Sequence, residues 1–161
     1  MVIDIQNDIT KHYKEIIGNI NQVIDWATLN DIHVVYIRHE NLSEGTRTFK
    51  HNTHGSELVP DLKIASNNIF TKYQGNALTS KDFQEFINKN HICDLIVTGA
   101  DAVACVKSTV YNLTKSNYSV QVLSDCITSY DKRKIDEMLR YYESKGSKII
   151  KTSDLLLNHV N

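Results

Sequence analysis

The sequence predicts a single α/β domain whose sheet is largely parallel. Short apolar runs alternate along the chain with longer segments of helical period, the pattern of strands joined by crossover helices. The apolar runs are rich in β-branched residues, as strands buried on both faces usually are. With 161 residues, 41% hydrophobic content and one proline, the chain has the size of one compact domain. We therefore expect one domain over residues 1–161.

Six apolar runs are the expected strands. In chain order they are VIDI (2–5), HVVYIR (33–38), NNIF (67–70), DLIVTG (94–99), SVQVLS (119–124) and KII (148–150). Four segments between them carry apolar residues at helical spacing, which predicts helices that pack on the sheet. These segments are 16–27, 83–87, 106–113 and 135–142.

Residues 39–66 interrupt this alternation with a polar, irregular stretch. The only proline of the chain lies here, and neither the strand period nor the helix period persists. Long irregular segments in compact domains are often functional. We expect this segment to form a substrate lid or a partner surface.

Charge and hydropathy argue against several classes of partner. The formal net charge is −1 and no basic block is present, so nothing favours nucleic acid or an anionic membrane. No apolar run approaches the roughly 20 residues that cross a bilayer, and MVIDIQND lacks the pattern of a secretory signal. The expected location is cytoplasmic, and the expected partners are a small-molecule substrate and further copies of the chain.

The three cysteines do not form a disulfide or zinc pattern. Their number is odd and their spacing is not that of metal ligands. Cys93 and Cys126 are expected to be packing residues. Cys105 opens a predicted helix after the fourth predicted strand.

Polar side chains beyond three strand ends define a candidate site. Asp4 ends the first expected strand, Lys72 lies just beyond the third, and Cys105 follows the fourth. Ligands of open α/β sheets bind beyond the carboxyl ends of strands, where the strand order reverses. If the order is 3-2-1-4-5-6, the three side chains share one crevice.

A cysteine in this position has a chemical and a structural interpretation. A helix N-terminus and a nearby cation favour the thiolate, so the pattern predicts a nucleophilic Cys105 whose pKa lies below the usual value of about 8.5, although Asp4 opposes this. The alternative is a buried packing thiol, with Asp4 capping a turn and Lys72 solvated.

These residues also carry a family resemblance. The segments VIDIQND, FTKYQGNALTSKDFQEFI, LIVTGADAVACVKSTVYNLTKSNYSVQVLSD and SDCITS, in this order and spacing, resemble the isochorismatase-like cysteine hydrolases. This group contains the nicotinamidases and carbamoylsarcosine amidohydrolase, and the likeness covers nearly the whole chain. It implies a three-layer α/β/α sandwich with a mostly parallel sheet of order 3-2-1-4-5-6. It also implies a homo-oligomer that hydrolyses a small amide or related C–N bond.

The resemblance assigns roles to individual residues. Asp4 would take the thiol proton, Cys105 would attack the carbonyl and form a thioester, and Lys72 would position both. The backbone N–H groups of Asp101 and Cys105 would bind the oxyanion, beside a cis peptide bond between Ala100 and Asp101.

Substrate contacts are expected from Gln6 and His39, the latter because it follows a strand end. The chain also departs from the family pattern. Family members often have Thr-Asp shortly before the cysteine, where this chain has Ala102 and Val103, and nicotinamidases do not have an acidic residue at position 101. The substrate therefore stays open.

Nicotinamidases bind a metal through an aspartate and histidines of the region that corresponds to residues 39–66. His39, His51, His54 and Glu57 lie in or near this segment, but the Asp-x-His pattern is missing because the second strand ends YIRHEN. We expect no metal and no cofactor.

Other functions stay open beside amide hydrolysis. Vinyl-ether hydrolysis of the isochorismate type needs an acid rather than a nucleophile, so the retained cysteine counts against it. No GxGxxG or GxxxxGK[ST] motif supports a nucleotide-binding module. A redox-sensing module would need an accessible cysteine of low pKa with a partner. A family member that has lost activity and serves as a binding protein is the last alternative.

Overall fold

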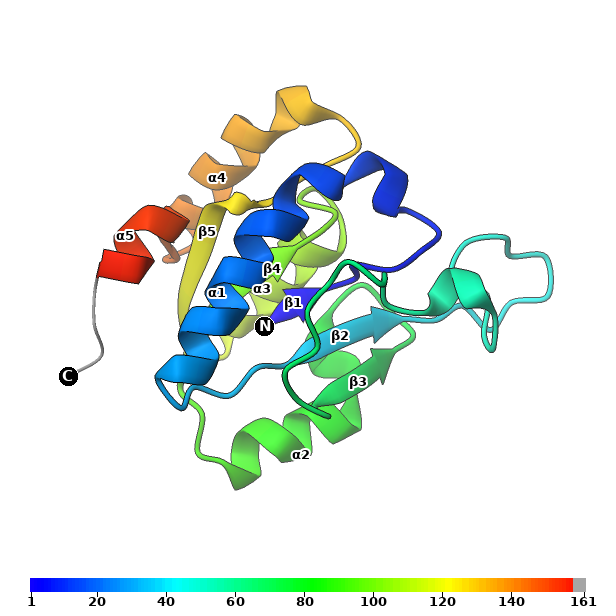
Figure 1. The fold of residues 1–161 in the computed structure, drawn as a ribbon, viewed down its shortest axis with the longest axis horizontal. Helices are drawn as coiled ribbons and strands as arrows, with labels where there is room; N and C mark the ends of the chain where they lie inside the picture. Colours follow the sequence, from blue (N-terminus) through cyan, green and yellow to red (C-terminus); the bar gives the residue numbers. More distant parts are fainter. Residues whose placement is uncertain (158–161) are drawn as a thin grey trace.

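The computed structural model contains one six-stranded sheet with helices on both faces, and it describes residues 1–157 (Figure 1). The strands are β1 (Val2–Ile3), β2 (Tyr36–His39), β3 (Ile69–Lys72), β4 (Asp94–Gly99), β5 (Ser119–Ile127) and β6 (Lys148–Ile150). Their order is β3-β2-β1-β4-β5-β6, and every neighbouring pair is parallel. The predicted fold class and strand order are confirmed.

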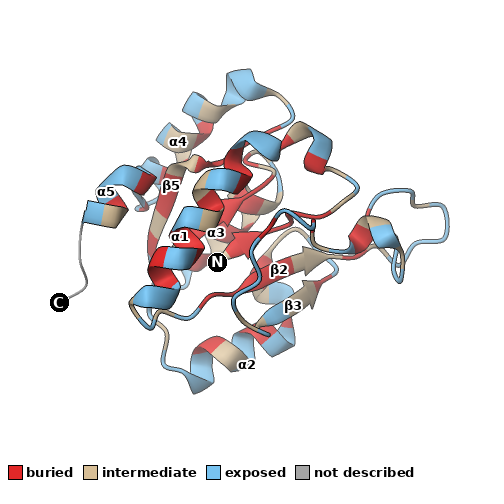
Figure 2. Ribbon diagram, viewed as in Figure 1, coloured by how far each residue is buried: buried red, intermediate tan, exposed pale blue. Residues whose placement is uncertain are grey.

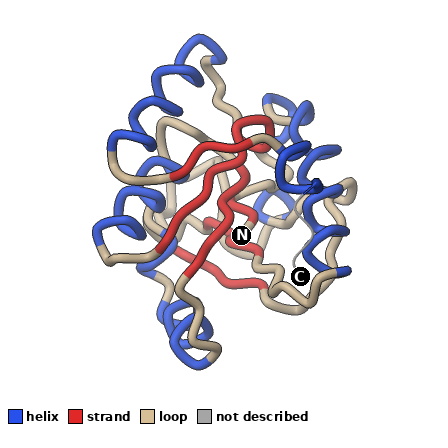
Figure 3. The backbone as a smooth tube through the Cα atoms, turned by 90° about the vertical axis from the view of Figure 1, so that its left-hand side faces the viewer, coloured by secondary structure: helices blue, strands red, loops and turns tan. Residues whose placement is uncertain are grey.

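Helices cover the sheet in two outer layers (Figure 3). The helices are α1 (Ile17–Leu29), α2 (Lys81–Lys89), α3 (Cys105–Lys115), α4 (Ile135–Ser144) and α5 (Thr152–Leu157). One core cluster joins the apolar face of α1 to α5, and a second joins α2, α3 and α4. Buried residues lie along the strands and on the inward faces of the helices (Figure 2). Helix α5 was not anticipated, because six residues are too few for a helical period to stand out.

Four strands differ from their expected bounds: β2 and β3 lie further along the chain than the expected 33–38 and 67–70, and β1 and β5 change only at their carboxyl ends. β1 ends at Ile3, because Asp4 adopts a left-handed conformation with a φ of 55° and so leaves the strand. β5 continues to Ile127, because its register against β4 shifts between Val97 and Gly99 and pairing resumes beyond the shift. Both differences occur at the carboxyl edge of the sheet.

Gly99 allows β4 and β1 to approach closely at this edge. Its φ is 121°, and a Cβ atom at this position would lie 2.2 Å from the carbonyl oxygen of Ile3. The next residue, Ala100, donates a hydrogen bond of 3.0 Å to the same carbonyl. The chain leaving β4 therefore passes directly beside Asp4, which follows β1.

The segment between β2 and β3 is irregular and projects beyond the sheet (cyan to green in Figure 1). Gln6 ties it to the segment after β1: its Nε2 donates to the carbonyl oxygens of His39 and Ser56 at 2.8 and 2.7 Å. Asp8 adds a second tie, since its Oδ2 accepts a hydrogen bond of 2.7 Å from the backbone N–H of Phe49. The start of this segment is thus held at the carboxyl edge of the sheet.

Within residues 1–157, no helix is both long and apolar enough to cross a bilayer.

Candidate active site

The three side chains singled out in the sequence converge at the carboxyl edge of the sheet. Lys72, at the end of β3, donates from Nζ to Oδ2 of Asp4 at 3.0 Å and to Sγ of Cys105 at 3.4 Å. Cys105 is the first residue of α3. The side chains of Lys72 and Asp4 are 0% and 1% exposed, so the ion pair is fully buried. Strands β1 and β4 flank the point where the strand order reverses, which brings residues 4 and 105 together.

His39 supplies a third partner for the lysine. Its Nδ1 lies 2.9 Å from Nζ of Lys72, and its Nε2 lies 3.0 Å from Oδ1 of Asn41. An ammonium group can only donate, so Nδ1 accepts and the ring proton is assigned to Nε2. Both ring nitrogens are therefore engaged by protein groups. The imidazole contacts the lysine, and its contact with a substrate stays a prediction.

Gln6, whose expected contact with substrate stays a prediction, is bonded to the backbone in this structure. The side chain is fully buried. Its Nε2 donates to two backbone carbonyls, and its Oε1 accepts from the backbone N–H of His39 at 2.8 Å. Gln6 therefore fixes the backbone at the end of β2, with its amide turned toward the protein.

Burial sets the protonation equilibria of the nucleophile and its neighbour. Burial raises the pKa of Asp4 above its usual value, while the adjacent Lys72 charge acts in the opposite direction. Oδ1 of Asp4 has no hydrogen-bond partner among the described residues, and a carboxylate oxygen of Asp4 lies within 4.8 Å of the sulfur of Cys105. The carboxylate thus lies near the thiol and has one oxygen without a hydrogen-bond partner.

The sequence predicted a lowered pKa for Cys105, and this prediction is wrong. Burial, followed by the negative charge of Asp4, raises the pKa of the thiol to about 12. Lys72 opposes this shift but does not cancel it. The resting residue is a thiol rather than a thiolate.

Two backbone N–H groups at the start of α3 and just before it have no acceptor within residues 1–157. The peptide bond between Ala100 and Asp101 is cis. The carbonyl oxygen of Asp101 accepts hydrogen bonds from Ala104 and Val106, both at 3.1 Å, which starts helix α3. Among residues 1–157, the N–H groups of Asp101 and Cys105 donate to no acceptor. These are the two donors that the family resemblance assigns to an oxyanion.

The side chain of Asp101 is held in place by three donors. Oδ2 accepts from the hydroxyl of Tyr13 at 2.8 Å and from the backbone N–H of Tyr130 at 2.9 Å, and Oδ1 accepts from the N–H of Val103 at 2.9 Å. Burial, followed by this bond, raises the pKa of Tyr13. Tyr13 was not anticipated, because it stands in TKHYKE with no periodic signal. It fixes the carboxylate of the residue that offers one free N–H.

A metal would compete with the lysine for the centre of this site. Asp4, His39 and Cys105 offer donor atoms within 4.8 Å of one another, the one such group of three in the described part of the chain. Nζ of Lys72 contacts all three, at 2.9 to 3.4 Å. Its charge stands where a metal ion would stand, so these residues do not fit a metal.

The loop histidines form separate pairs. Nδ1 of His51 lies 2.5 Å from Oε2 of Glu40, and Nδ1 of His54 lies 3.3 Å from Oε2 of Glu57. Each imidazole is thus committed to one carboxylate. Neither pair belongs to a larger group of potential metal donors within residues 1–157.

The other two cysteines lie away from the site. Cys126 is buried in β5, where its sulfur lies 3.1 Å from Oγ1 of Thr152. Cys93 is exposed, so its expected packing role is wrong; it sits in the turn before β4 rather than in the core. All three cysteines are free thiols.

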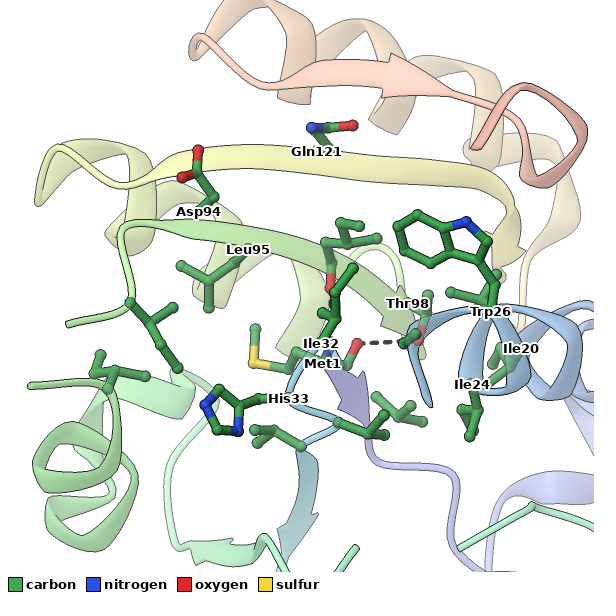
Figure 4. A pocket seen from close by; sticks show the side chains of 18 of the residues that line it. Met1, Ile20, Ile24, Trp26, Ile32, His33, Asp94, Leu95, Thr98 and Gln121 are labelled. Atoms are coloured by element: carbon green, nitrogen blue, oxygen red, sulfur yellow. Dashed lines mark hydrogen bonds between the residues drawn. The ribbon is translucent and has the colours of Figure 1, made fainter. Parts of the chain in front are cut away.

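A cavity of about 530 Å³ lies at the opposite edge of the sheet, near the amino ends of the strands (Figure 4). Apolar side chains from α1 and β4 line it, including Ile24, Trp26 and Leu95. None of the residues that line it belongs to the cluster around Lys72. The cavity is therefore separate from the candidate active site.

The fold is a three-layer α/β sandwich with the candidate site at the carboxyl edge of its parallel sheet, and comparison with known proteins gives the family. The isochorismatase domain model matches residues 1–154, so the chain belongs to the isochorismatase family. A search of curated proteins found no match.

Solved structures share the fold at low sequence identity. An isochorismatase-like hydrolase from Alkaliphilus metalliredigens is 22% identical, with a TM-score of 0.87 over 97% of this chain and 95% of its own. N-carbamoylsarcosine amidase from Thermoplasma acidophilum is 18% identical, with a TM-score of 0.81 over 94% of each chain. Pyrazinamidase of Pyrococcus horikoshii, solved with zinc, is 20% identical, with a TM-score of 0.81 over 93% of this chain and 96% of its own. Family membership makes the protein a hydrolase of the isochorismatase type.

Proposed function

We propose that the protein is a cysteine-dependent hydrolase that cleaves a small amide or a related C–N bond. The observation that carries the proposal is the buried lysine that contacts both a carboxylate and a thiol, at 3.0 and 3.4 Å. Two structural relatives are amidases by description, N-carbamoylsarcosine amidase and pyrazinamidase. Their likeness supports the same class of reaction here.

The proposed reaction begins with proton transfer from Cys105 to the free carboxylate oxygen of Asp4. A thiol pKa of about 12 makes such a base necessary at neutral pH. The raised pKa of Asp4 improves its match to the thiol. The sulfur then attacks the carbonyl carbon, and the positive charge of Lys72 stabilises the anionic sulfur as it forms.

The carbonyl oxygen gains negative charge as the carbon–sulfur bond forms. The free N–H groups of Asp101 and Cys105 are the proposed donors to this oxyanion. Collapse of the tetrahedral intermediate breaks the C–N bond, and the proton held by Asp4 passes to the leaving amine. Water then attacks the thioester, gives up a proton to Asp4, and releases the carboxylic acid and the thiol.

A screen of small primary amides and ureido compounds for ammonia release tests this function. We expect turnover of at least one compound, and loss of that turnover in Cys105→Ala. Ammonia release by Cys105→Ala at the wild-type rate would contradict the cysteine mechanism. Failure of the wild-type protein on the whole panel would favour a binding protein without activity.

Vinyl-ether hydrolysis is the second candidate, and one observation favours it. Burial raises the pKa of Asp4, which favours the protonated form that an acid catalyst needs. This reaction does not need the sulfur, so Cys105→Ala would retain it while Asp4→Asn would lose it. The presence of a thiol beside the base makes amide cleavage our first choice.

A further inference from the structure

We propose that His39 is a positioning residue that holds the ammonium group of Lys72 through a neutral imidazole. The inference rests on the proposed function, in which Lys72 supports the anion of Cys105. In this role the imidazole supports the catalytic lysine.

The first support is the number of hydrogen-bond partners around the ammonium. A lysine ammonium has three N–H donors and no acceptor. Nζ of Lys72 has three partners, namely Oδ2 of Asp4 at 3.0 Å, Nδ1 of His39 at 2.9 Å and Sγ of Cys105 at 3.4 Å. The side chain is 0% exposed, so bulk water cannot replace a lost partner. The imidazole accounts for one third of the ammonium's hydrogen bonds.

The second support is the fixed orientation of the ring. Nε2 of His39 lies 3.0 Å from Oδ1 of Asn41, and Nδ2 of Asn41 donates to the carbonyl oxygen of Thr48 at 2.7 Å. The donor role of Nδ2 fixes the amide so that Oδ1 faces the ring. Asn41 therefore receives the proton on Nε2 and leaves Nδ1 free to accept from Lys72. Gln6 holds the backbone of His39 at the same time.

The contact with the ammonium requires a ring without a proton on Nδ1. Lys72 faces it from the end of β3, Asp4 from the residue after β1, and Cys105 from the start of α3. Glu40, the next residue along the chain, is committed to Arg38 and His51. The charges that face the ring thus already form one ion pair. A second proton on the ring would place a positive charge 2.9 Å from the ammonium.

The ring tautomer can be measured directly by NMR. In ¹⁵N-labelled wild-type protein at pH 7, we expect His39 to be neutral, with its proton on Nε2. Lys72→Met should shift the Nδ1 resonance of His39, while exposed His33, which lies near the opposite edge of the sheet, should keep its ring signals. A proton on Nδ1, or an imidazolium at pH 7 in the wild-type protein, would overturn the proposal.

Two substitutions separate the acceptor from the bulk of the side chain. His39→Asn keeps an acceptor close to the position of Nδ1, whereas His39→Leu removes it. Without this acceptor, one N–H of the buried ammonium is unpaired, which favours the neutral amine and withdraws the positive charge from the sulfur.

The rate at which iodoacetamide alkylates Cys105 at pH 8.5 depends on the positive charge of Lys72 and can be measured without any substrate. His39→Leu should slow alkylation by about tenfold or more, the size expected for a hydrogen bond to a charged group. His39→Asn should stay within about twofold of wild type, because the acceptor is kept. Cys93, exposed in the same molecules, is the internal reference.

The outcomes distinguish this inference from the proposed function. Wild-type alkylation in His39→Leu, or alkylation as slow in His39→Asn as in His39→Leu, would refute the positioning role. If His39→Leu does not fold, the NMR tautomer and the His39→Asn rate still decide. An amide screen without turnover would remove the proposed function and leave these measurements unaffected.

Discussion

Lys72 carries a positive charge into a region where neither its own side chain nor that of Asp4 reaches solvent. Desolvating both charges costs free energy that their attraction and hydrogen bonds must offset. Replacing one partner leaves the other charge buried and unpaired, while replacing both removes the desolvation cost. The stability of the fold and the activity of the site should therefore respond differently to the same substitutions.

We expect Lys72→Met to lower the free energy of unfolding by about 3–5 kcal/mol, because it leaves Asp4 buried without a counter-charge. The double variant Asp4→Asn/Lys72→Met should recover most of this loss. Urea denaturation of the wild-type protein, both single variants and the double variant gives the coupling energy between the two positions. A double variant as unstable as Lys72→Met would contradict the interpretation.

At pH 7.5, iodoacetamide should modify exposed Cys93 before Cys105. The pKa of about 12 leaves Cys105 with very little thiolate at this pH. Asp4→Asn should accelerate modification of Cys105, because the charge of Asp4 raises the thiol pKa, yet it should abolish amide hydrolysis by removing the base. Peptide mapping after brief exposure measures both sites. Faster labelling of Cys105 than of Cys93 in the wild-type protein would show that its pKa is low after all.

At the scale of elements, the close contact of β4 with β1 places the sulfur beside the carboxylate. This contact depends on Gly99, whose missing side chain leaves room for the backbone of Ile3. Two other glycines separate the effect of a positive φ from the effect of the close contact. Gly146 has a φ of 101°, but a Cβ atom added there would meet no other atom within 4 Å. Gly18 lies in α1, and a Cβ atom added there would also meet no other atom within 4 Å.

We expect Gly99→Ala to lower the free energy of unfolding by at least about 2 kcal/mol, since it adds both backbone strain and a clash. Gly146→Ala should show the strain alone, about 1 kcal/mol. Gly18→Ala should raise stability by up to about 1 kcal/mol, because alanine favours the helix. Thermal and urea unfolding of the three variants provide the comparison. Equal effects of Gly99→Ala and Gly146→Ala would exclude the clash as the cause.

Much of this arrangement was predictable from the sequence, because periodicity is a local property and the family resemblance implied the strand order. Alternating apolar runs predicted the parallel sheet, and the rule for strand ends brought Asp4, Lys72 and Cys105 to one edge. The exact ends of β1 and β5 were not predictable. They depend on a left-handed residue and on a register shift that only the packed sheet determines.

The partners of the site residues were harder to predict than the residues themselves. Nothing in YIRHEN indicates that His39 faces a lysine rather than a substrate, and nothing in TKHYKE directs Tyr13 to Asp101. These contacts join segments more than 30 residues apart and are decided by tertiary packing. The raised pKa of Cys105 was not predicted for the same reason, because the residues next to it in the sequence do not indicate how deeply its side chain is buried.

At the scale of the whole molecule, we expect a homo-oligomer, most simply a dimer. The segment between β2 and β3 projects beyond the sheet and exposes 63% of Leu42, which suits a contact with a second copy (Figure 1). Light scattering at micromolar concentration should give a multiple of the 18.4 kDa chain mass. The mass of one chain would contradict this expectation, and Leu42→Lys should shift a dimer toward that mass.

The buried thiols and phenols also predict how the whole fold responds to alkali. Burial raises the pKa values of Cys105 and Cys126 to about 12, and it raises those of Tyr13 and Tyr142 above their usual range. In the unfolded chain, thiols lose their protons near pH 8.5 and phenols near pH 10, by approximate reference values. Above these pH values the folded state binds more protons than the unfolded state, so the free energy of unfolding falls as pH rises.

The stabilising effect of these groups should be complete below about pH 8.5 and should be lost progressively toward pH 12. Each buried thiol should account for about 2 kcal/mol of the loss between pH 7.5 and pH 10. Cys126→Ala, which lies outside the candidate active site, should therefore lose about 2 kcal/mol less than wild type over this interval. Urea denaturation at the two pH values measures the difference. If both proteins lost the same amount, Cys126 would titrate alike in the folded and unfolded states, and burial in β5 would not control its proton.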